Sequence, residues 1–230
     1  MSVLTPFRRL GLALDPAARR ITAELQRVSR HITFADRILD IGSGEAPYAR
    51  FFPHRQYVTA DLAARANVRC DAAALPFASR TFDLVLCTEV LEHLPDPDAT
   101  LEEIRRLLRG RGALVLSTPL TWGVHDARDY HRWTESGLRQ LLARHGFSVI
   151  ELRPRGGILL CLGGLLMVVP WQVFGAAVER RWWQSLLFAA TYTLLTPVAL
   201  FIAALDGIDR RKHFTQGYTA VCYGSARPDQ

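Results

Sequence analysis

The stretch EVLEH (residues 89–93) combines two carboxylates with an imidazole, side chains that transfer protons or bind divalent metal ions in enzymes. Spacings of three and four residues place Glu89, Glu92 and His93 on one face if the stretch is helical. Such a set can hold a divalent ion, and His125 would complete it. We favour the alternative, a structural or cofactor-side role without a metal, and we assign His93 to contact with the substrate.

A second group of polar side chains lies in TPLTWGVHDARDYHRWT (residues 118–134), directly after a predicted strand. Histidine is the side chain best suited to remove a proton from oxygen or nitrogen near neutral pH. We therefore predict that His125 and His131 are catalytic, with His125 preferred, and that Tyr130 contacts the substrate. The alternative is a polar loop whose histidines only cap and solvate.

The stretch ILDIGSGEAPY (residues 38–48) is typical of a nucleotide-binding turn between a strand and a helix. Gly42 and Gly44 let the backbone turn tightly beneath a ligand. In a dinucleotide-binding turn the helix N-terminus takes a pyrophosphate, but here Glu45 adds a negative charge and Pro47 replaces the third glycine. These two residues disfavour NAD, whereas a cofactor without phosphates meets no such objection.

Two aspartates follow the next predicted strands. Asp61 lies nineteen residues after Gly42, and a carboxylate there can accept hydrogen bonds from both ribose hydroxyls. Asp71 ends a short strand and can accept from an adenine amino group, while the small side chain of Ala72 lets the ring approach. The alternative for each acid is a helix cap or a surface charge.

Short apolar runs that alternate with helical patterns must position these groups. RILDI, YVTAD, FDLVLCT and ALVLSTP predict buried parallel strands, and SVIELR and TAVCYGSA predict two more. Helices are predicted at residues 17–30, 98–108 and 134–146, the last with Thr134 as N-cap and Gly146 as C-terminal stop. The alternation predicts an α/β sandwich with a mainly parallel sheet. An alternative for the first helix is a basic helix lying on a membrane surface.

The stretches ILDIGSG, TADL and CDAAALPFASRTFDLVLCTEVLEHLPDP occur in an order that resembles the class I S-adenosylmethionine-dependent methyltransferases, specifically their broad small-molecule group. The resemblance covers residues 35–153 and the terminal strand near residues 217–224. It implies a Rossmann-like, seven-stranded sheet with helices on both faces, in which a last antiparallel strand inserts beside the fifth. The chain departs from the family pattern at Ala46, where a third glycine is frequent.

The same resemblance implies that S-adenosyl-L-methionine is the cofactor. It places the methionine part at the glycine loop, the ribose on Asp61 and the adenine beside Asp71 and Ala72. Thr88 and Glu89 would close the pocket at the end of the fourth strand. The cofactor-binding residues that we expect are Asp40, Gly42, Ser43, Gly44, Asp61, Leu62, Asp71, Ala72, Thr88 and Glu89.

The composition changes after residue 155. Residues 156–178 and 182–205 contain no charged side chain, and each run is long enough to cross a bilayer, which takes about 20 residues. Tryptophans lie near the junction of the runs, and basic residues are more frequent on the outer flanks than in the tip. We predict an apolar two-helix hairpin before the last strand that crosses or enters the membrane. The alternative is a soluble apolar cap or a dimer interface.

The predicted organisation is an N-terminal basic helical segment (residues 1–35), a methyltransferase domain (36–155), the hairpin (156–212) and a terminal strand that returns to the sheet (213–230). The formal charge of +6 favours anionic partners. The four cysteines are isolated from one another, which indicates reduced thiols, and no secretory signal is expected. We expect the protein at the cytoplasmic face of the inner (plasma) membrane.

A membrane hairpin narrows the methyl acceptor, because a soluble metabolite needs no membrane anchor. The stretch DYHRWTESGLRQLLARHGFSV resembles methyltransferases found among bacterial cell-surface polysaccharide enzymes, which implies a lipid-linked glycan intermediate. Alternatives are a quinone or other isoprenoid, a soluble small molecule, a non-catalytic membrane-tethered cofactor-binding module, or a nucleotide-dependent oxidoreductase. Nucleic acid is disfavoured because the arginines are dispersed and no aromatic-plus-basic platform is evident. The oligomeric state is left open.

Overall fold

The computed structural model describes residues 14–32, 35–62, 66–174 and 182–224. The chain divides into two compact units. One unit contains Glu24–Arg153 and the terminal strand from Gly217 onward, and the other contains Pro154–Gln216 together with the segment before Glu24.

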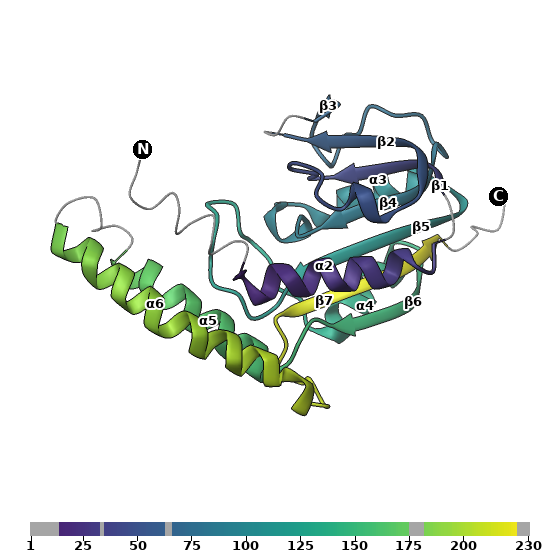
Figure 1. Ribbon diagram of the computed structural model, residues 1–230. Coiled ribbons are helices and arrows are strands. Elements are labelled where there is room, and N and C mark those ends of the chain that lie inside the picture. Colours follow the sequence, from purple (N-terminus) through teal and green to yellow (C-terminus); the bar gives the residue numbers. More distant parts are fainter. Residues whose placement is uncertain (1–13, 33–34, 63–65, 175–181, 225–230) are drawn as a thin grey trace. The chain divides into compact units, whose positions relative to one another are not determined.

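A seven-stranded sheet with strand order β3-β2-β1-β4-β5-β7-β6 forms the centre of the first unit (Figure 1). The central strands are buried along most of their length, because a parallel strand with helices on both faces meets no solvent. Strand β7 runs antiparallel to β5, with Leu114 opposite Cys222, and lies between β5 and β6. The predicted sheet, including its last antiparallel strand, is confirmed. The strands are β1 (Ala35–Ile41), β2 (His54–Asp61), β3 (Val68–Arg69), β4 (Phe82–Thr88), β5 (Leu108–Pro119), β6 (Phe147–Pro154) and β7 (Gly217–Gly224).

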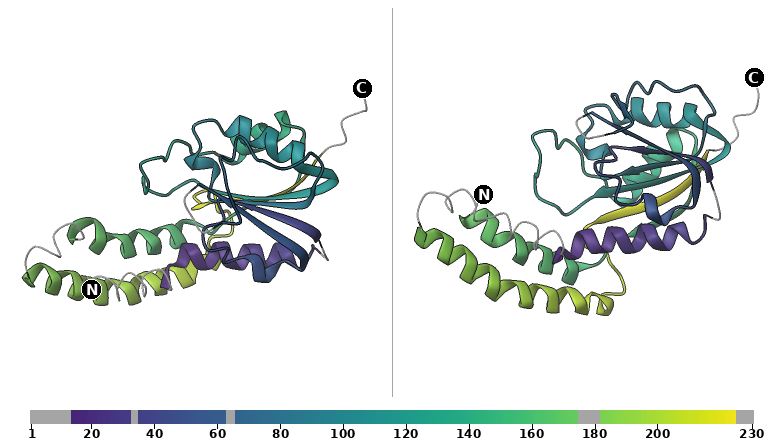
Figure 2. Two further views of the ribbon diagram at one scale, coloured as in Figure 1. Left: turned by 90° about the horizontal axis from the view of Figure 1, so that it is seen from above. Right: turned by 45° about the horizontal axis from the view of Figure 1, so that its top comes forward.

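Helices cover both faces of this sheet (Figure 2). Helices α3 (Pro97–Leu107) and α4 (Glu135–Arg144) lie on one face, and the C-terminal part of α2 (Pro16–Ser29) lies on the other. In α2 the side chains of Leu25 and Val28 are buried in the protein. The apolar side of the helix is therefore covered at these two residues, as expected for a helix that packs on the domain.

Side-chain caps fix the starts of α3 and α4. Asp96 accepts a hydrogen bond from the N–H of Ala99 at 3.1 Å, and Thr134 accepts one from the N–H of Gly137 at 3.2 Å. Helix α4 is followed by Gly146, whose φ of +73° belongs to the left-handed region that ends many helices. The predicted cap and the predicted stop of this helix are both confirmed.

Two stretches that we expected to be helical are not α-helices. After the glycine loop the chain makes turns and one short 3-10 helix, η1 (Ala49–Phe51), because Pro47 lacks a backbone N–H and β2 begins soon afterwards. In the EVLEH stretch, Glu89 has a left-handed φ of +53°, and Leu91–His93 form a single 3-10 turn, η2. The expectation that Glu89 shares a helical face with the other two side chains was wrong.

Helices α5 (Ile158–Phe174) and α6 (Trp182–Ala204) lie side by side as a hairpin in the second unit (Figure 1). They approach closely at Gly163, where a Cβ atom would lie only 2.6 Å from the carbonyl oxygen of Ala199. The predicted apolar two-helix insertion before the last strand is therefore present.

Two aspartates close the base of the hairpin. Buried Asp206 accepts hydrogen bonds from the N–H of Gly157 at 2.8 Å and of Leu160 at 3.0 Å. Asp209 accepts one from the N–H of Ile158 at 3.0 Å. These carboxylates satisfy donors at the start of α5 that have no partner within the helix. The hairpin therefore begins and ends at the same place.

Within the described residues, one helix is long and apolar enough to cross a membrane, as judged by its length and composition. It spans Trp183–Ile208 and so includes the short 3-10 helix η3 (Leu205–Ile208) that follows α6. Helix α5 has 17 described residues, or roughly 26 Å, which is shorter than the ~30 Å hydrocarbon core of a bilayer. Of the two runs expected to be long enough to cross, α6 alone passes this test of length and composition, and residues 175–181 lie outside the described part.

Candidate active site

A cavity of about 240 Å³ opens where β1, β2 and β4 end. The carboxyl-terminal ends of parallel strands are the edge of an α/β sheet at which ligands bind. Six of the predicted site residues line this cavity, so it is the candidate active site. The complete lining is Ile41, Gly42, Ala60, Asp61, Leu62, Cys70, Ala72, Leu75, Glu89, Val90, His93, Leu94, Asp126 and Arg128.

A larger cavity of about 770 Å³ lies among basic side chains that include Arg80, Arg106 and Arg144. It borders Leu108, the first residue of β5, and therefore lies near the opposite, amino-terminal edge of the sheet. No predicted site residue lines it, and the position of a ligand site in this class of sheet favours the smaller cavity.

The glycine loop after β1 requires left-handed backbone at three positions. Gly42 has φ +63°, and a Cβ atom there would lie 2.4 Å from Cγ2 of Val90, so only glycine fits. Gly44 has φ +51°, and its N–H donates to Oδ2 of Asp61 at 3.1 Å. Ala46 also has φ +51°, at the position where the family often has a third glycine. The sharp turn therefore brings the loop against the end of β2.

Three of the residues predicted to hold the nucleoside line the cavity, and one does not. The carboxylate of Asp61 accepts a hydrogen bond from the N–H of Gly44 and lines the cavity, as do Leu62 and Ala72. Asp71 is exposed and accepts a hydrogen bond from the N–H of Ala73 at 2.9 Å, which is a turn within the chain. The adenine role of Asp71 therefore remains a prediction without a place in the cavity lining.

Asp40, Ser43 and Thr88 are buried and do not line the cavity. Asp40 accepts a hydrogen bond from the hydroxyl of Tyr57 at 2.7 Å. Burial raises the pKa of Asp40 to about 6, the Tyr57 hydrogen bond opposes this shift, and the negative charge of Asp61 adds to it. These three residues lie outside the cavity lining, and their predicted contacts with the cofactor stay predictions.

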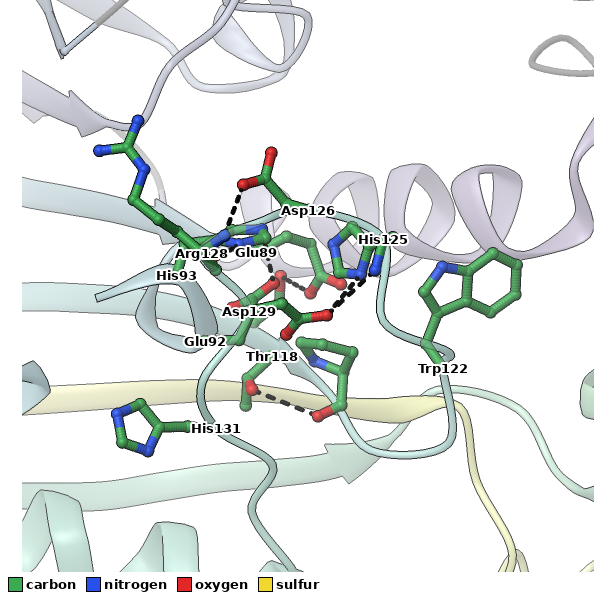
Figure 3. A network of polar contacts seen from close by, with 12 residues as sticks. Glu89, Glu92, His93, Thr118, Trp122, His125, Asp126, Arg128, Asp129 and His131 are labelled. Carbon is green, nitrogen blue, oxygen red and sulfur yellow. Dashed lines mark hydrogen bonds and ion pairs between the residues drawn. The ribbon is translucent and has the colours of Figure 1, made fainter. Parts of the chain in front are cut away.

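Glu92, His93 and His125 form a polar cluster beside the cavity (Figure 3). One ligand atom from each residue lies within 4.8 Å of the other two. The side chain of Glu92 is fully buried, and its Oε1 lies 3.8 Å from Nε2 of His93. The imidazole rings of His93 and His125 meet edge to face, with centroids 4.9 Å apart. Because His93 also lines the cavity, the cluster adjoins the candidate active site.

The loop after β5 folds back over η2 and orients both imidazoles. Nδ1 of His93 lies 2.7 Å from the carbonyl oxygen of Arg128, and Nδ1 of His125 lies 3.0 Å from Oδ2 of Asp129. Arg132 donates to Asp129 at 2.7 Å and holds the pKa of that carboxyl well below its usual range. A carbonyl or carboxylate oxygen can only accept, so each Nδ1 carries a hydrogen, and in the neutral ring Nε2 is the acceptor nitrogen.

His131 lies apart from this cluster, as Figure 3 shows. Its ring packs against Trp133, with centroids 5.3 Å apart, and lies 6.2 Å from the ring of Tyr130. Tyr130 is 52 % exposed, and neither residue lines the cavity. The backbone N–H of Tyr130 instead donates to the carbonyl of Glu92 at 2.8 Å. The structure thus places His131 and Tyr130 outside the cavity lining, and their predicted roles in catalysis and substrate contact stay predictions.

Eight residues of the lining were not among the predicted site residues, and they include four apolar side chains after strand ends and one arginine. The four apolar side chains follow the ends of β3 and β4 and form an apolar wall; they are Cys70, Leu75, Val90 and Leu94. Their position after a predicted strand could have indicated that they line the site. Arg128 lies in an irregular loop, where neither periodicity nor a motif indicates direction.

Comparisons with known proteins agree with this architecture. A family model described as a methyltransferase domain matches residues 14–152. An uncharacterised methyltransferase of Mycobacterium sp. (strain KMS) is 33 % identical over 180 residues, covering 66 % of this chain and 71 % of the relative. A Burkholderia thailandensis 1,6-didemethyltoxoflavin-N1-methyltransferase with bound S-adenosylhomocysteine has a TM-score of 0.55 at 17 % identity, covering 89 % of this chain and 78 % of that one. An Archaeoglobus fulgidus SAM-dependent methyltransferase also has a TM-score of 0.55, at 15 % identity, over 88 % and 92 %.

Proposed function

Since the chain belongs to the methyltransferase-domain family, we propose that it methylates a membrane-associated or lipid-linked acceptor. The chain is an S-adenosylmethionine-dependent methyltransferase, as the sequence predicted for the fold, the enzyme class and the cofactor. The nature of the acceptor is the step that we propose, and its support comes from the apolar hairpin.

The cavity residues fit a cofactor of this kind. S-adenosylmethionine supplies a methyl group on a sulfonium, which an acceptor atom attacks in line. Gly42 and Asp61 both line the cavity, and a carboxylate such as that of Asp61 can accept hydrogen bonds from ribose hydroxyls. We propose that Asp61 holds the ribose, that Ala72 borders the adenine, and that the loop from Gly42 to Gly44 lies against the methionine part.

The single observation that carries the membrane proposal is the uncovered apolar surface of α6. Leu194 is 71 % exposed, Phe201 is 66 % exposed and Leu186 is 60 % exposed. Residues 182–205 contain no charge, and a contiguous apolar surface of this size is rare on a protein that remains in water. Basic residues follow the hairpin at positions 210–212, where they would meet the anionic cytoplasmic leaflet.

A membrane anchor brings an enzyme to acceptors that do not leave the membrane. We therefore propose a lipid-linked acceptor, in agreement with the resemblance of residues 129–149 to enzymes of bacterial cell-surface polysaccharides. On the acceptor side, His93 lines the cavity and His125 lies against it. We assign contact with the acceptor to these two imidazoles, with the ionised Asp129 orienting His125.

Vesicle flotation tests the membrane proposal. Purified protein is mixed with vesicles of phosphatidylcholine and phosphatidylglycerol, and it is compared with a variant in which a short glycine-serine linker replaces residues 157–206. We expect the full chain to float and the shortened variant to stay at the bottom while it still binds S-adenosylhomocysteine. Flotation of both proteins would show that the membrane anchor lies outside the hairpin. Failure of the full chain to float would make the hairpin a cap or a dimer interface.

A further inference from the structure

The cluster of Glu92, His93 and His125 combines two imidazoles with one carboxylate at the edge of the cavity. We propose that it binds one divalent first-row transition-metal ion. The ligands are Nε2 of His93, Nε2 of His125 and a carboxylate oxygen of Glu92. On the sequence alone we grouped Glu89 with these three residues and favoured a role without a metal, whereas the structure groups Glu92, His93 and His125.

The first argument is that both imidazoles are already oriented as metal ligands. Metal-binding histidines usually donate their second ring N–H to a carbonyl or a carboxylate, which fixes the tautomer and the ring direction. Here the carbonyl of Arg128 receives Nδ1–H of His93 at 2.7 Å, and the carboxylate of Asp129 receives Nδ1–H of His125 at 3.0 Å. Each Nε2 therefore presents a lone pair, and Nε2 of His93 lies on the side of Glu92.

The second argument is the gradient of exposure across the three ligands. The side chain of Glu92 is fully buried, whereas that of His93 is 29 % exposed and that of His125 is 36 % exposed. An ion can therefore enter between the imidazoles and reach the carboxylate at the base. Three ligands on one side leave coordination positions open toward solvent and the cavity, as in sites built from two histidines and one carboxylate.

The spacing of the ligand atoms sets a requirement on binding. Ligand atoms about 2.1 Å from an ion lie roughly 3.0–3.5 Å from one another. The present separations of up to 4.8 Å must therefore shorten when an ion enters. Rotation of the two imidazoles supplies this movement, because both side chains are partly exposed, while Glu92 remains fixed by its burial.

The donor set selects among ions. Imidazole nitrogen suits Mn²⁺, Fe²⁺, Co²⁺ and Zn²⁺, whereas Mg²⁺ and Ca²⁺ prefer ligand sets made of oxygen. The role of the ion rests on the proposed function. Because His93 lines the same cavity as Asp61 and Glu89, the open coordination positions would bind an acceptor oxygen beside the methyl donor. This specifies the acceptor further, as a molecule that carries a hydroxyl or another oxygen donor.

Titration with Co²⁺, followed by visible absorption, tests the site without any need for activity. The full chain in detergent is first freed of metal with a chelator. We expect one Co²⁺ per chain, with absorption bands that indicate nitrogen ligands. His93→Ala, His125→Ala and Glu92→Gln should each weaken binding at least tenfold, by analogy with the ~10–100-fold losses seen for residues that support metal ligands. His54→Ala, an exposed imidazole at the start of β2, is the matched control and should bind as the unmodified chain does.

Two further readouts make the outcome decisive. Affinity for S-adenosylhomocysteine, measured on each variant, shows whether the fold is retained. Three results would each overturn the proposal. The first is that Co²⁺ does not bind, and the second is an equal loss of Co²⁺ affinity in His54→Ala and His93→Ala. The third is that Mg²⁺ displaces Co²⁺ at the same concentration as Mn²⁺ does. If Co²⁺ does not bind but lipid is methylated, the metal site fails and the proposed function stands. If Co²⁺ binds and only soluble acceptors are methylated, the metal site stands and the proposed function fails.

Discussion

The backbone N–H of Gly44 donates a hydrogen bond to Oδ2 of Asp61 at 3.1 Å. This contact joins the glycine loop after β1 to the end of β2, two segments that are seventeen residues apart in the sequence. It fixes the carboxylate at the wall of the cavity. The loop and the aspartate therefore act as one binding element, and the predictions begin with them.

Replacing Asp61 with alanine should weaken S-adenosylhomocysteine binding by about 10–100-fold, because hydrogen bonds to a charged group contribute about 1.5–3 kcal/mol. Isothermal titration calorimetry measures the affinity. Asp71→Ala is the matched control, since Asp71 is exposed and outside the cavity lining, and it should leave the affinity nearly unchanged. An equal loss of affinity in the two variants would support the predicted contact of Asp71 with the adenine. An unchanged affinity in Asp61→Ala would show that Asp61 does not bind the ribose.

Gly42→Ala should destabilise the protein more than Gly44→Ala. Both positions have a left-handed φ, which costs about 1 kcal/mol for a residue with a side chain. Only at Gly42 does the new Cβ also overlap a neighbour, Cγ2 of Val90 at 2.4 Å, whereas nothing lies within 4 Å at Gly44. Urea denaturation compares the variants. Adding Val90→Ala should restore part of the stability lost in Gly42→Ala, and a lack of any rescue would contradict this cause.

The stability of the protein should depend on pH through Asp40. Its pKa is raised from 3.8 to about 6 by burial, so the folded protein favours the protonated form. The contribution of Asp40 to stability is complete below pH 3.8 and is lost as the pH rises through 6. A shift of this size corresponds to about 3 kcal/mol, at 1.36 kcal/mol per pH unit.

Asp40→Asn removes this titration. The free energy of unfolding of the variant, relative to the unmodified protein, should therefore increase between pH 4 and pH 7, the range around the raised pKa of about 6. Chemical denaturation at a series of pH values measures the difference. A difference that stays constant with pH would show that Asp40 is ionised in the folded protein with an ordinary pKa.

A charge on the exposed face of α6 should weaken membrane binding. Leu194→Arg places a guanidinium at a position that is 71 % exposed within a helix free of charge. Insertion of arginine at the centre of a bilayer helix costs about 2.5–3.5 kcal/mol. Flotation of the variant with vesicles should therefore fall, whereas Ile150→Arg, at an exposed position in β6, should leave flotation unchanged. Equal effects of both substitutions would argue against insertion of α6.

Much of the fold followed from local patterns in the sequence. Apolar runs predicted the long strands because these are buried on both faces, and Thr134 and Gly146 marked the limits of α4 because caps act through neighbouring backbone groups. The two misplaced helices have a physical cause. Pro47 and the left-handed backbone of Glu89 each prevent the regular hydrogen bonding of an α-helix at one residue. A helix prediction that averages propensity over several residues does not detect such a single position.

The candidate site could be predicted only where a residue's role depends on its place at a strand end. Gly42, Asp61 and Ala72 were found in this way. The sequence offered His125 only as a possible addition to the EVLEH set. Its contact with His93 depends on how the loop after β5 folds back, which contacts with Arg128 and Asp129 fix.

Label transfer from S-adenosylmethionine tests the central claim most directly. Purified full-length protein is incubated with methyl-labelled S-adenosylmethionine and with two extracts of the source cells, one lipid and one soluble, and Asp61→Ala serves as the inactive control. We predict that label enters the lipid extract and that, at a cofactor concentration near the affinity of the unmodified protein, Asp61→Ala strongly reduces the transfer. Label confined to the soluble extract would contradict a membrane-associated or lipid-linked acceptor, even though the chain would still be a methyltransferase.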